Sequence, residues 1–213
     1  MVGVSHCFTK EAAVRHILTV SFVLISVLIG AAVPASAQSG MLKLGIHVDR
    51  EVGADGGVGV AAWGMVPQAN KAPGKWLLVA GPRYKAAKWW VEFMAGAILV
   101  DDASVPLVDV RFNVDTWSAV NIWGNVELII PRHGPRSVYL FLEANRKVAD
   151  WLLIGVETEN DLFVPAEDAL SIGPHIVIPG ERINLILAYQ FHPSKEGGQK
   201  ASDQIWARMI FKF

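Results

Sequence analysis

The sequence reads Val120-Asn121-Ile122-Trp123-Gly124-Asn125-Val126-Glu127-Leu128-Ile129-Ile130 near the middle of the chain. From Val120 to Ile130 every second residue is apolar or glycine, and the residues between them are mostly polar. Successive side chains of a β-strand point to opposite faces, so this pattern predicts a strand with one apolar and one mixed face. A tilted strand of about 9–11 residues is long enough to cross a lipid bilayer.

The same alternation recurs along the chain, with turn residues between the segments and almost no helical periodicity after residue 37. Such segments exceed the usual strand length of about 5–6 residues in soluble sheets. We therefore expect an all-β chain. The eleven expected strands are Met41–Glu51, Gly57–Val66, Lys75–Tyr84, Lys88–Leu99, Pro106–Val114, Ala119–Ile130, Ser137–Arg146, Asp150–Asn160, Leu170–Ile178, Arg182–His192 and Gln204–Phe213.

The composition narrows the class of protein. The chain has 213 residues, of which 52% are hydrophobic and 18% charged, and its formal net charge is −1. So high an apolar content excludes intrinsic disorder, and the absence of a basic excess argues against nucleic acid as a partner. No cofactor motif occurs: Gly53-Ala54-Asp55-Gly56-Gly57 precedes no helix, so we interpret it as a turn rather than a phosphate loop.

The first 37 residues have the features of a secretory signal peptide. Lys10 and Arg15 precede an apolar stretch from Ile17 to Val33, and Ala35-Ser36-Ala37 offers small residues for cleavage before Gln38. An uncleaved membrane anchor is the alternative. We expect residues 1–37 to be the signal peptide and residues 38–213 to form the folded domain. The only cysteine, Cys7, lies in the expected signal peptide, so disulfides are not expected in the mature chain.

The connectors between the expected strands alternate in length. Counting back from the C-terminus, the first connector is long and the second, Pro179-Gly180-Glu181, is short. Long and short connectors then alternate as far as Pro67–Gly74, and residues 100–105 are one of the long ones. Bacterial outer-membrane barrels have short turns on the periplasmic side and longer loops outside. The pattern is typical of an up-and-down transmembrane barrel.

The last strand carries the resemblance to a known family. Ile205, Ala207, Met209, Phe211 and the terminal Phe213 are apolar at every second position, although the glycine often found in such a segment is missing. This segment resembles the C-terminal assembly signal of Gram-negative outer-membrane β-barrel proteins. The resemblance implies an outer-membrane location, contact with outer-membrane lipid and recognition by the barrel insertion machinery. Met209, Phe211 and Phe213 are the residues to which it assigns the assembly signal.

A barrel with both termini in the periplasm needs an even number of strands. We therefore predict an antiparallel barrel of ten strands, with Met41–Glu51 left over in the lumen or the periplasm. Twelve strands are the alternative. The oligomeric state is not predicted.

If the more apolar face of each strand meets lipid, the opposite face carries the charged residues. Charges removed from bulk water must be paired or must face a water-filled lumen, so these residues either plug the barrel or line a polar pore. Arg111 and Arg208 are the expected centres of ion pairing with carboxylates. The predicted lumen-facing cluster is Arg83, Glu92, Asp109, Arg111, Glu127, Glu143, Glu157, His175 and Arg208.

Aromatic residues cluster near the expected strand ends, where Trp and Tyr favour a membrane interface. They are Trp89, Trp90, Trp117, Trp151, Phe163, Tyr189 and Phe213; Trp123 falls on a polar face without an assigned role.

No catalytic group and no metal site is predicted. Ser171 and His175 share one face of a strand, but four residues of strand separate them by about 13 Å. No histidine or cysteine spacing typical of metal ligands occurs.

The favoured function is an outer-membrane barrel with a structural or passive small-solute transport role. A barrel enzyme acting on envelope lipids, or a soluble periplasmic β-barrel or sandwich that binds an apolar ligand, is the alternative.

Overall fold

A computed structural model describes residues 40–52, 57–117, 120–162, 169–192, 195–196, 199–200 and 203–213. The predicted signal peptide, residues 1–37, lies outside the described residues. Phe163 and most of the Gly53–Gly57 turn also lie outside them. Within the described ranges no helix is long and apolar enough to cross a membrane.

The predicted strands are all present, with ends that differ from the prediction by a few residues. The strands are β1 (Gly40–Glu51), β2 (Val58–Val66), β3 (Trp76–Lys85), β4 (Trp89–Val100), β5 (Ala103–Trp117), β6 (Val120–Ile129), β7 (Ser137–Ala149), β8 (Leu152–Leu162), β9 (Ala169–Ile178), β10 (Ile183–Gln190) and β13 (Gln204–Lys212). A small hairpin of β11 (Lys195–Glu196) and β12 (Gln199–Lys200) precedes β13 and forms a separate sheet. The all-β prediction is confirmed.

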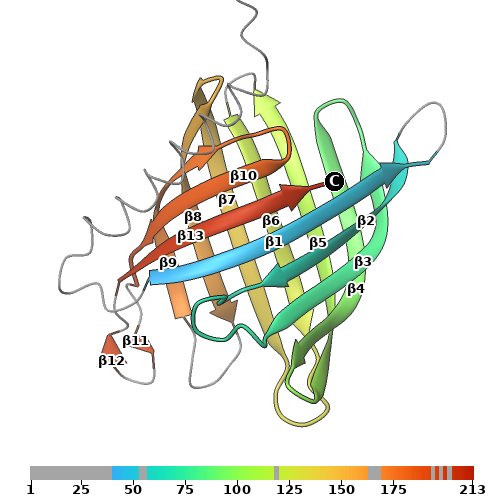
Figure 1. Cartoon of the computed structure of the whole chain (residues 1–213), viewed down its shortest axis with the longest axis vertical. Coiled ribbons are helices and arrows are strands. Elements are labelled where there is room, and N and C mark those ends of the chain that lie inside the picture. Colours follow the sequence, from blue (N-terminus) through green and yellow to red (C-terminus); the bar gives the residue numbers. More distant parts are fainter. Residues whose placement is uncertain are drawn as a thin grey trace, which may run out of the picture. The chain divides into compact units, whose positions relative to one another are not determined.

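The strands form one closed barrel, in which β1 lies between β2 and β13 (Figure 1). β1 pairs antiparallel with β2 and parallel with β13, in a register that joins Gly40 to Ile205 and His47 to Lys212. The barrel therefore has eleven strands, and the predicted counts of ten and twelve are wrong. Met41–Glu51 is a full member of the wall rather than a leftover segment. The error came from requiring both ends of the barrel chain on one side, although a parallel ladder closes the sheet and removes its edges equally well.

An odd number of strands puts the two ends of the barrel chain at opposite openings. We call these openings the Gly40 end, where β1 begins, and the Phe213 end, where β13 stops. The Gly40 end carries the connectors 67–75, 101–102, 130–136, 163–168 and 191–203, whereas the Phe213 end carries 52–57, 86–88, 118–119, 150–151 and 179–182, which are shorter on average. The predicted alternation fails at one place, because β4 and β5 extend to a tight turn at Asp101-Asp102 in which Asp101 has a φ of 48°. At the Phe213 end, a hydrogen bond from Lys147 to Asp150 lowers the pKa of that exposed carboxyl.

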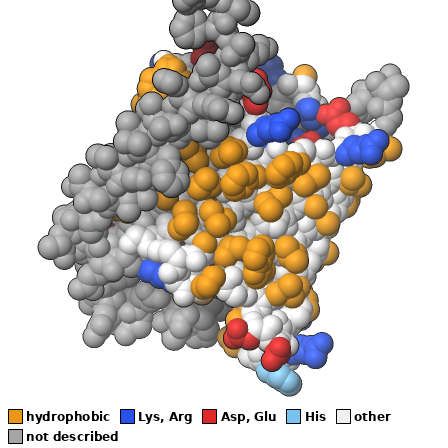
Figure 2. Space-filling view, in the orientation of Figure 1, with side chains coloured by type: hydrophobic (Ala, Val, Ile, Leu, Met, Phe, Trp, Pro, Cys, Tyr) orange, Lys and Arg blue, Asp and Glu red, His pale blue; other side chains and the backbone are white. Residues whose placement is uncertain are grey.

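Burial alternates along most strands, and the buried set is rich in charge while the exposed set is apolar. On β4 the side chain of Glu92 is buried and its neighbour Phe93 is 56% exposed, and on β8 Glu157 is buried while Val156 is 55% exposed. Figure 2 shows hydrophobic side chains over the middle of the described surface and charged ones towards its two ends. The polarity of this barrel is thus the reverse of a water-soluble fold, in which charged side chains are mostly exposed.

Two prolines within strands are accommodated by interruptions of the neighbouring ladder. Pro82 of β3 pairs with Val60 of β2, but the ladder to β4 has no pairs at Gly81 and Pro82. Pro174 of β9 pairs with Val156 of β8, and the ladder to β10 is likewise interrupted there. Since proline has no N–H, it fits where its strand loses a partner on one side.

Candidate functional site

The residues predicted to face the lumen all point into the barrel, and the structure divides them into two groups. Glu92 and Arg111 are fully buried, and Glu143 is half-buried at the wall of a central cavity. The first group lies on β3–β6 and contains Arg83, Glu92, Asp109, Arg111 and Glu127. The second lies on β7–β9 and β13 and contains Glu143, Glu157, His175 and Arg208.

Glu92 is the centre of the first group. Its carboxylate accepts hydrogen bonds from Trp63 Nε1 (2.9 Å) and Arg83 Nη1 (3.2 Å), and His47 Nε2 lies 3.3 Å from Oε1. Arg83 also contacts Asp49 at 2.9 Å. These contacts join β1, β2, β3 and β4 inside the barrel and satisfy charges that would otherwise be costly to bury.

Arg111 is the second cation of this group, as predicted from the sequence. Its Nε donates to Asp109 at 2.7 Å, and its Nη2 lies 3.5 Å from Glu127 Oε1. The guanidinium also lies over the Trp63 ring, 4.5 Å from the centroid, which adds a cation–π contact. Asn125 donates to Glu127 at 2.8 Å, so this carboxylate has two polar neighbours.

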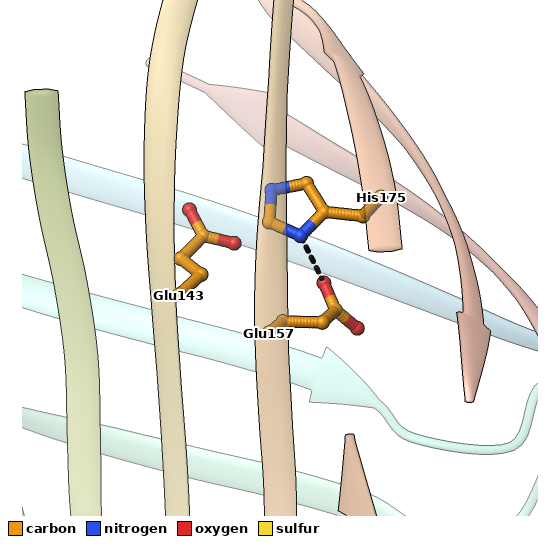
Figure 3. A group of neighbouring side chains, drawn as sticks. All are labelled: Glu143, Glu157 and His175. Atoms are coloured by element: carbon orange, nitrogen blue, oxygen red, sulfur yellow. Dashed lines mark ion pairs between the residues drawn. The ribbon is translucent and has the colours of Figure 1, made fainter. Parts of the chain in front are cut away.

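Glu157 is the centre of the second group. It is bound by Arg208 from β13 and by Gln190 from β10, and His175 Nδ1 of β9 lies 3.1 Å from its Oε2. Figure 3 shows the imidazole of His175 between the carboxylates of Glu143 and Glu157. Ligand atoms of Glu143, Glu157 and His175 all lie within 4.8 Å of one another. The sequence did not predict this grouping, because the three residues come from three different strands.

Lys43 and His47 of β1 are interior residues that the sequence analysis missed. Lys43 binds Glu159, which also accepts a hydrogen bond from the Tyr139 hydroxyl, and its ammonium lies 4.1 Å from the centroid of the Trp206 ring. Both residues alternate correctly with apolar neighbours in the sequence. They were overlooked because their strand was left out of the barrel.

Aromatic rings cross the interior between opposite walls. His47 stacks on Trp63 of β2 (4.1 Å between centroids), Trp63 lies 6.2 Å from Trp123 of β6, and Trp123 meets Phe141 of β7 edge-on at 5.3 Å. Arg208 of β13 lies over Phe141 at 4.8 Å. Trp63, Trp123 and Phe141, which we call the aromatic partition, therefore form a chain of ring contacts inside the barrel from β2 to β7. This gives Trp123 the role that the sequence could not assign.

Apolar side chains fill part of the interior beside the partition. Trp63 packs with a buried cluster formed by Leu77, Val79, Met94, Ile98 and Leu107. The remaining space is a cavity of about 650 Å³ whose walls include Lys43, Glu127, Glu143, Glu159 and Arg208. Its lining residues come from both ends of the barrel, for example Gln68 near the Gly40 end and Asn184 near the Phe213 end.

Ser171 and His175, which share one face of β9, are hydrogen-bonded to other groups and not to each other in the part of the chain that the structure describes. The Ser171 hydroxyl donates to the backbone oxygen of Glu159 at 2.7 Å, and His175 Nε2 hydrogen-bonds with Asn145. Ser171 and His175 lie opposite Glu159 and Gly155, at different levels of β8. His133 is exposed in the connector between β6 and β7. This arrangement offers no activated hydroxyl.

On the last strand Trp206 and Arg208 are buried in the barrel, and Met209 and Phe211 alternate with them on the other face. Phe213 is 73% exposed, and its N–H donates to the backbone oxygen of His47 at 3.0 Å. The side chain predicted to end the assembly signal is thus exposed.

No protein-family model matches the sequence, and neither a curated protein nor a solved structure matches it. The described interior holds paired charges, a group of carboxylate and imidazole side chains, and a cavity lined by charged, aromatic and apolar residues.

Proposed function

We propose that this protein is a membrane-spanning β-barrel of the outer membrane with a structural or passive small-solute transport role. The observation that carries the proposal is the reversed polarity of the wall, with apolar side chains outside and charged ones inside. Val60, Val108, Val126 and Ile176 are among the outward residues with exposed side chains. In water this surface would be an aggregation liability, whereas in a bilayer it is solvated by lipid tails.

The ends of the strands support the same proposal. Tyr84, Trp89 and Trp151 are exposed at the Phe213 end, and Trp76 is exposed at the Gly40 end. Aromatic rings at both rims of an apolar band are typical of a barrel in a bilayer. Exposed charged side chains lie at or beyond these rims, namely Lys71, Asp101, Asp102, Arg132 and Arg136 at one end and Arg50, Glu51, Lys85, Lys88, Arg146 and Lys147 at the other.

The partners that we propose follow from the surface and the last strand. Outer-membrane lipid covers the apolar band, and the insertion machinery recognises Met209, Phe211 and Phe213 during assembly. The chain would reach this location by export through a cleaved signal peptide. Phe213 lies at the end with the short connectors, which is where the periplasmic turns of a bacterial barrel would be.

Passive transport would use the central cavity. Its walls present carboxylates and cationic groups beside apolar and aromatic side chains, and water and small polar solutes would contact the charged part. The rings of the aromatic partition also line this cavity, which favours small solutes over large ones. We propose no lipid-directed chemistry, because the described serine and histidine of β9 are hydrogen-bonded to other groups.

Cell fractionation and reconstitution test the proposal in two steps. We expect the protein in the outer-membrane fraction, resistant to extraction by alkaline carbonate, and we expect a folded form in detergent whose gel migration changes on heating. Purified protein should then be inserted into planar lipid bilayers and its ion conductance recorded. Recovery as a soluble periplasmic protein that is stable without detergent would contradict the membrane assignment. Insertion into the bilayer without measurable conductance would be consistent with a structural role and would contradict passive transport of small solutes.

A further inference from the structure

His175 is held in one orientation by a hydrogen bond that crosses an intervening strand. Its Nε2 lies 2.5 Å from Asn145 Oδ1, and Asn145 Nδ2 donates to Glu143 Oε1 at 2.8 Å. With the amide nitrogen occupied by Glu143, the amide oxygen must accept from His175, so Nε2 carries a proton. In the neutral imidazole Nδ1 is then unprotonated, and its lone pair points into the barrel.

A glycine makes this contact possible. Gly155 of β8 lies between Asn145 of β7 and His175 of β9 and pairs with both. A methyl group at position 155 would lie 2.8 Å from His175 Nε2 and 2.9 Å from Asn145 Oδ1, so any larger residue would separate the two groups. A second inward position of the same ladder also pairs a polar residue with a glycine, since Glu157 of β8 lies opposite Gly173 of β9.

The lone pair of Nδ1 faces negative charge. Glu157 Oε2 is 3.1 Å from the buried Nδ1, an ion-pair contact whose geometry does not make a hydrogen bond. The ligand atoms of Glu143 lie within the same 4.8 Å group, and none of the described ion pairs includes Glu143. An unprotonated nitrogen beside two carboxylates is unfavourable unless a proton or a metal ion lies between them.

The cationic side chains around the site do not balance the charge of its carboxylates. Arg208 contacts Glu157 and interacts with Glu143 and Glu159 as well, but it supplies one positive charge to three carboxylates, and Lys43 is bound to Glu159. The described interior carries more carboxylates than cationic side chains. The carboxylates are Asp49, Glu92, Asp109, Glu127, Glu143, Glu157, Glu159 and Asp161, and the cationic groups are Lys43, Lys75, Arg83, Arg111, Arg208 and Lys212.

We propose that Glu143, Glu157 and His175 form a binding site for a divalent transition-metal ion of the Zn²⁺ or Mn²⁺ type. Two carboxylates with one imidazole nitrogen are a ligand set that such ions accept, and the imidazole makes Zn²⁺ or Mn²⁺ a better match than Mg²⁺ or Ca²⁺. Asn145 is the positioning residue: it fixes the tautomer of His175 and holds Glu143, as outer-shell groups do in metalloproteins. The site stands independently of the proposed membrane role, because it needs only the folded barrel.

Metal titration of the folded protein tests the site. Protein refolded in detergent and treated with EDTA is titrated with ZnCl₂ by calorimetry and with MnCl₂ by electron paramagnetic resonance. We expect one saturable ion per chain and weaker binding at acidic pH, because protons compete with a metal ion for carboxylate and imidazole ligands in general. Glu143→Gln and His175→Gln are each expected to weaken binding, and Asn145→Ala to weaken it about 10–100-fold. Glu127→Gln, the same chemical change in the other charged group, should bind like the parent.

Two results would overturn the site. One is the absence of saturable binding below millimolar metal, together with a ¹⁵N spectrum in which both nitrogens of His175 are protonated, because a proton would then occupy the place of the metal. The other is equal binding by Glu127→Gln and by the three site variants in samples with the same heat-modifiable folded fraction. A soluble protein that binds the metal as expected would contradict the membrane proposal and leave the metal site standing.

Discussion

Glu157 of β8 and Arg208 of β13 form an ion pair inside the barrel, although β9 and β10 lie between their strands in the sheet. Both side chains are buried, and Gln190 and His175 contact the same carboxylate. The pair therefore links two parts of the wall across the interior rather than along the ladder. Removing one partner of a buried ion pair leaves an uncompensated charge.

We predict that Arg208→Gln and Glu157→Gln each destabilise the folded barrel, by about 3–5 kcal/mol for a broken buried pair. The double variant should lose less than the sum of the two single losses, because neither charge is then left alone. Urea-induced unfolding in detergent or lipid vesicles, followed by tryptophan fluorescence, measures the four free energies of unfolding. Strictly additive losses would show that the two side chains do not interact in the folded protein.

The polarity of the wall predicts opposite effects at two adjacent positions. Val126 is exposed on the outer face in the middle of β6, and Asn125 points inward beside Glu127. Lysine on the lipid side near the midplane costs about 2–4 kcal/mol, so Val126→Lys should lower the folded fraction in membranes strongly. Asn125→Lys places its charge among carboxylates and should have the smaller effect.

Heat-modifiable gel migration in isolated membranes compares the folded fractions of these two variants. The parent and Val126→Thr are the controls, since threonine keeps the β-branched shape without a charge. A harmless Val126→Lys, with a damaging Asn125→Lys, is the order expected of a barrel surrounded by water, and it would contradict the membrane proposal.

The parallel pairing of β1 with β13 predicts which introduced cysteines can form a disulfide. Leu44 of β1 lies directly opposite Met209 of β13, and Cys7 is the only native cysteine. Neighbouring strands bring such positions within disulfide range, so Leu44→Cys with Met209→Cys should form a crosslink on mild oxidation. Leu44→Cys with Phe211→Cys, two positions further along, is the control that should react poorly. Val66 of β2 lies at the same level on the other side of β1, so efficient crosslinking of Val66→Cys with Met209→Cys would instead indicate a ten-stranded barrel without β1.

We predict that shortening a side chain of the aromatic partition raises the permeability of the barrel to ions. Trp123 contacts Trp63 and Phe141 in the interior, is only partly buried and lines the central cavity, so Trp123→Ala enlarges that cavity. Its cost in stability should be below the about 3–5 kcal/mol of a fully buried Trp→Ala change. Conductance in planar bilayers should rise above that of the parent. Trp151→Ala, at an exposed turn, is the control and should leave conductance unchanged; equal conductance of all three proteins would show that the partition does not limit passage.

We predict that removal of the last residue, Phe213, impairs assembly in the membrane. Phe213 is exposed and contributes its backbone N–H to a contact with β1. Deleting Phe213 should lower the amount of folded protein in the outer membrane while the purified chain still refolds in detergent. Pulse-chase labelling with heat-modifiable migration measures the assembly rate in cells, and Phe213→Tyr serves as the conservative control. Normal assembly of the deletion variant would argue against recognition through this residue.

The individual strands could be predicted from the sequence, because their signal is local. Alternation with a period of two, ended by turn residues, places each strand within a few positions of its structural bounds, as for Ser137–Arg146 against Ser137–Ala149. The same periodicity separates inward from outward residues, so Arg111 and Arg208 could be identified as interior cations before their partners were known. The difference between the predicted and the observed strand ends is also local. The turn between β4 and β5 consists of Asp101 and Asp102, whereas the predicted connector spans residues 100–105.

What the sequence determined by itself was therefore the set of strands and the face on which each side chain lies. Only the tertiary structure decided that β1 joins β13 in parallel, that Asn145 reaches His175 past Gly155, and that Trp63 meets Trp123 across the interior. The physical reason is distance along the chain. Alternation depends on neighbours one or two positions apart, whereas these contacts join residues brought together when the sheet curls and closes, and no periodicity within a strand records which strand completes the circle.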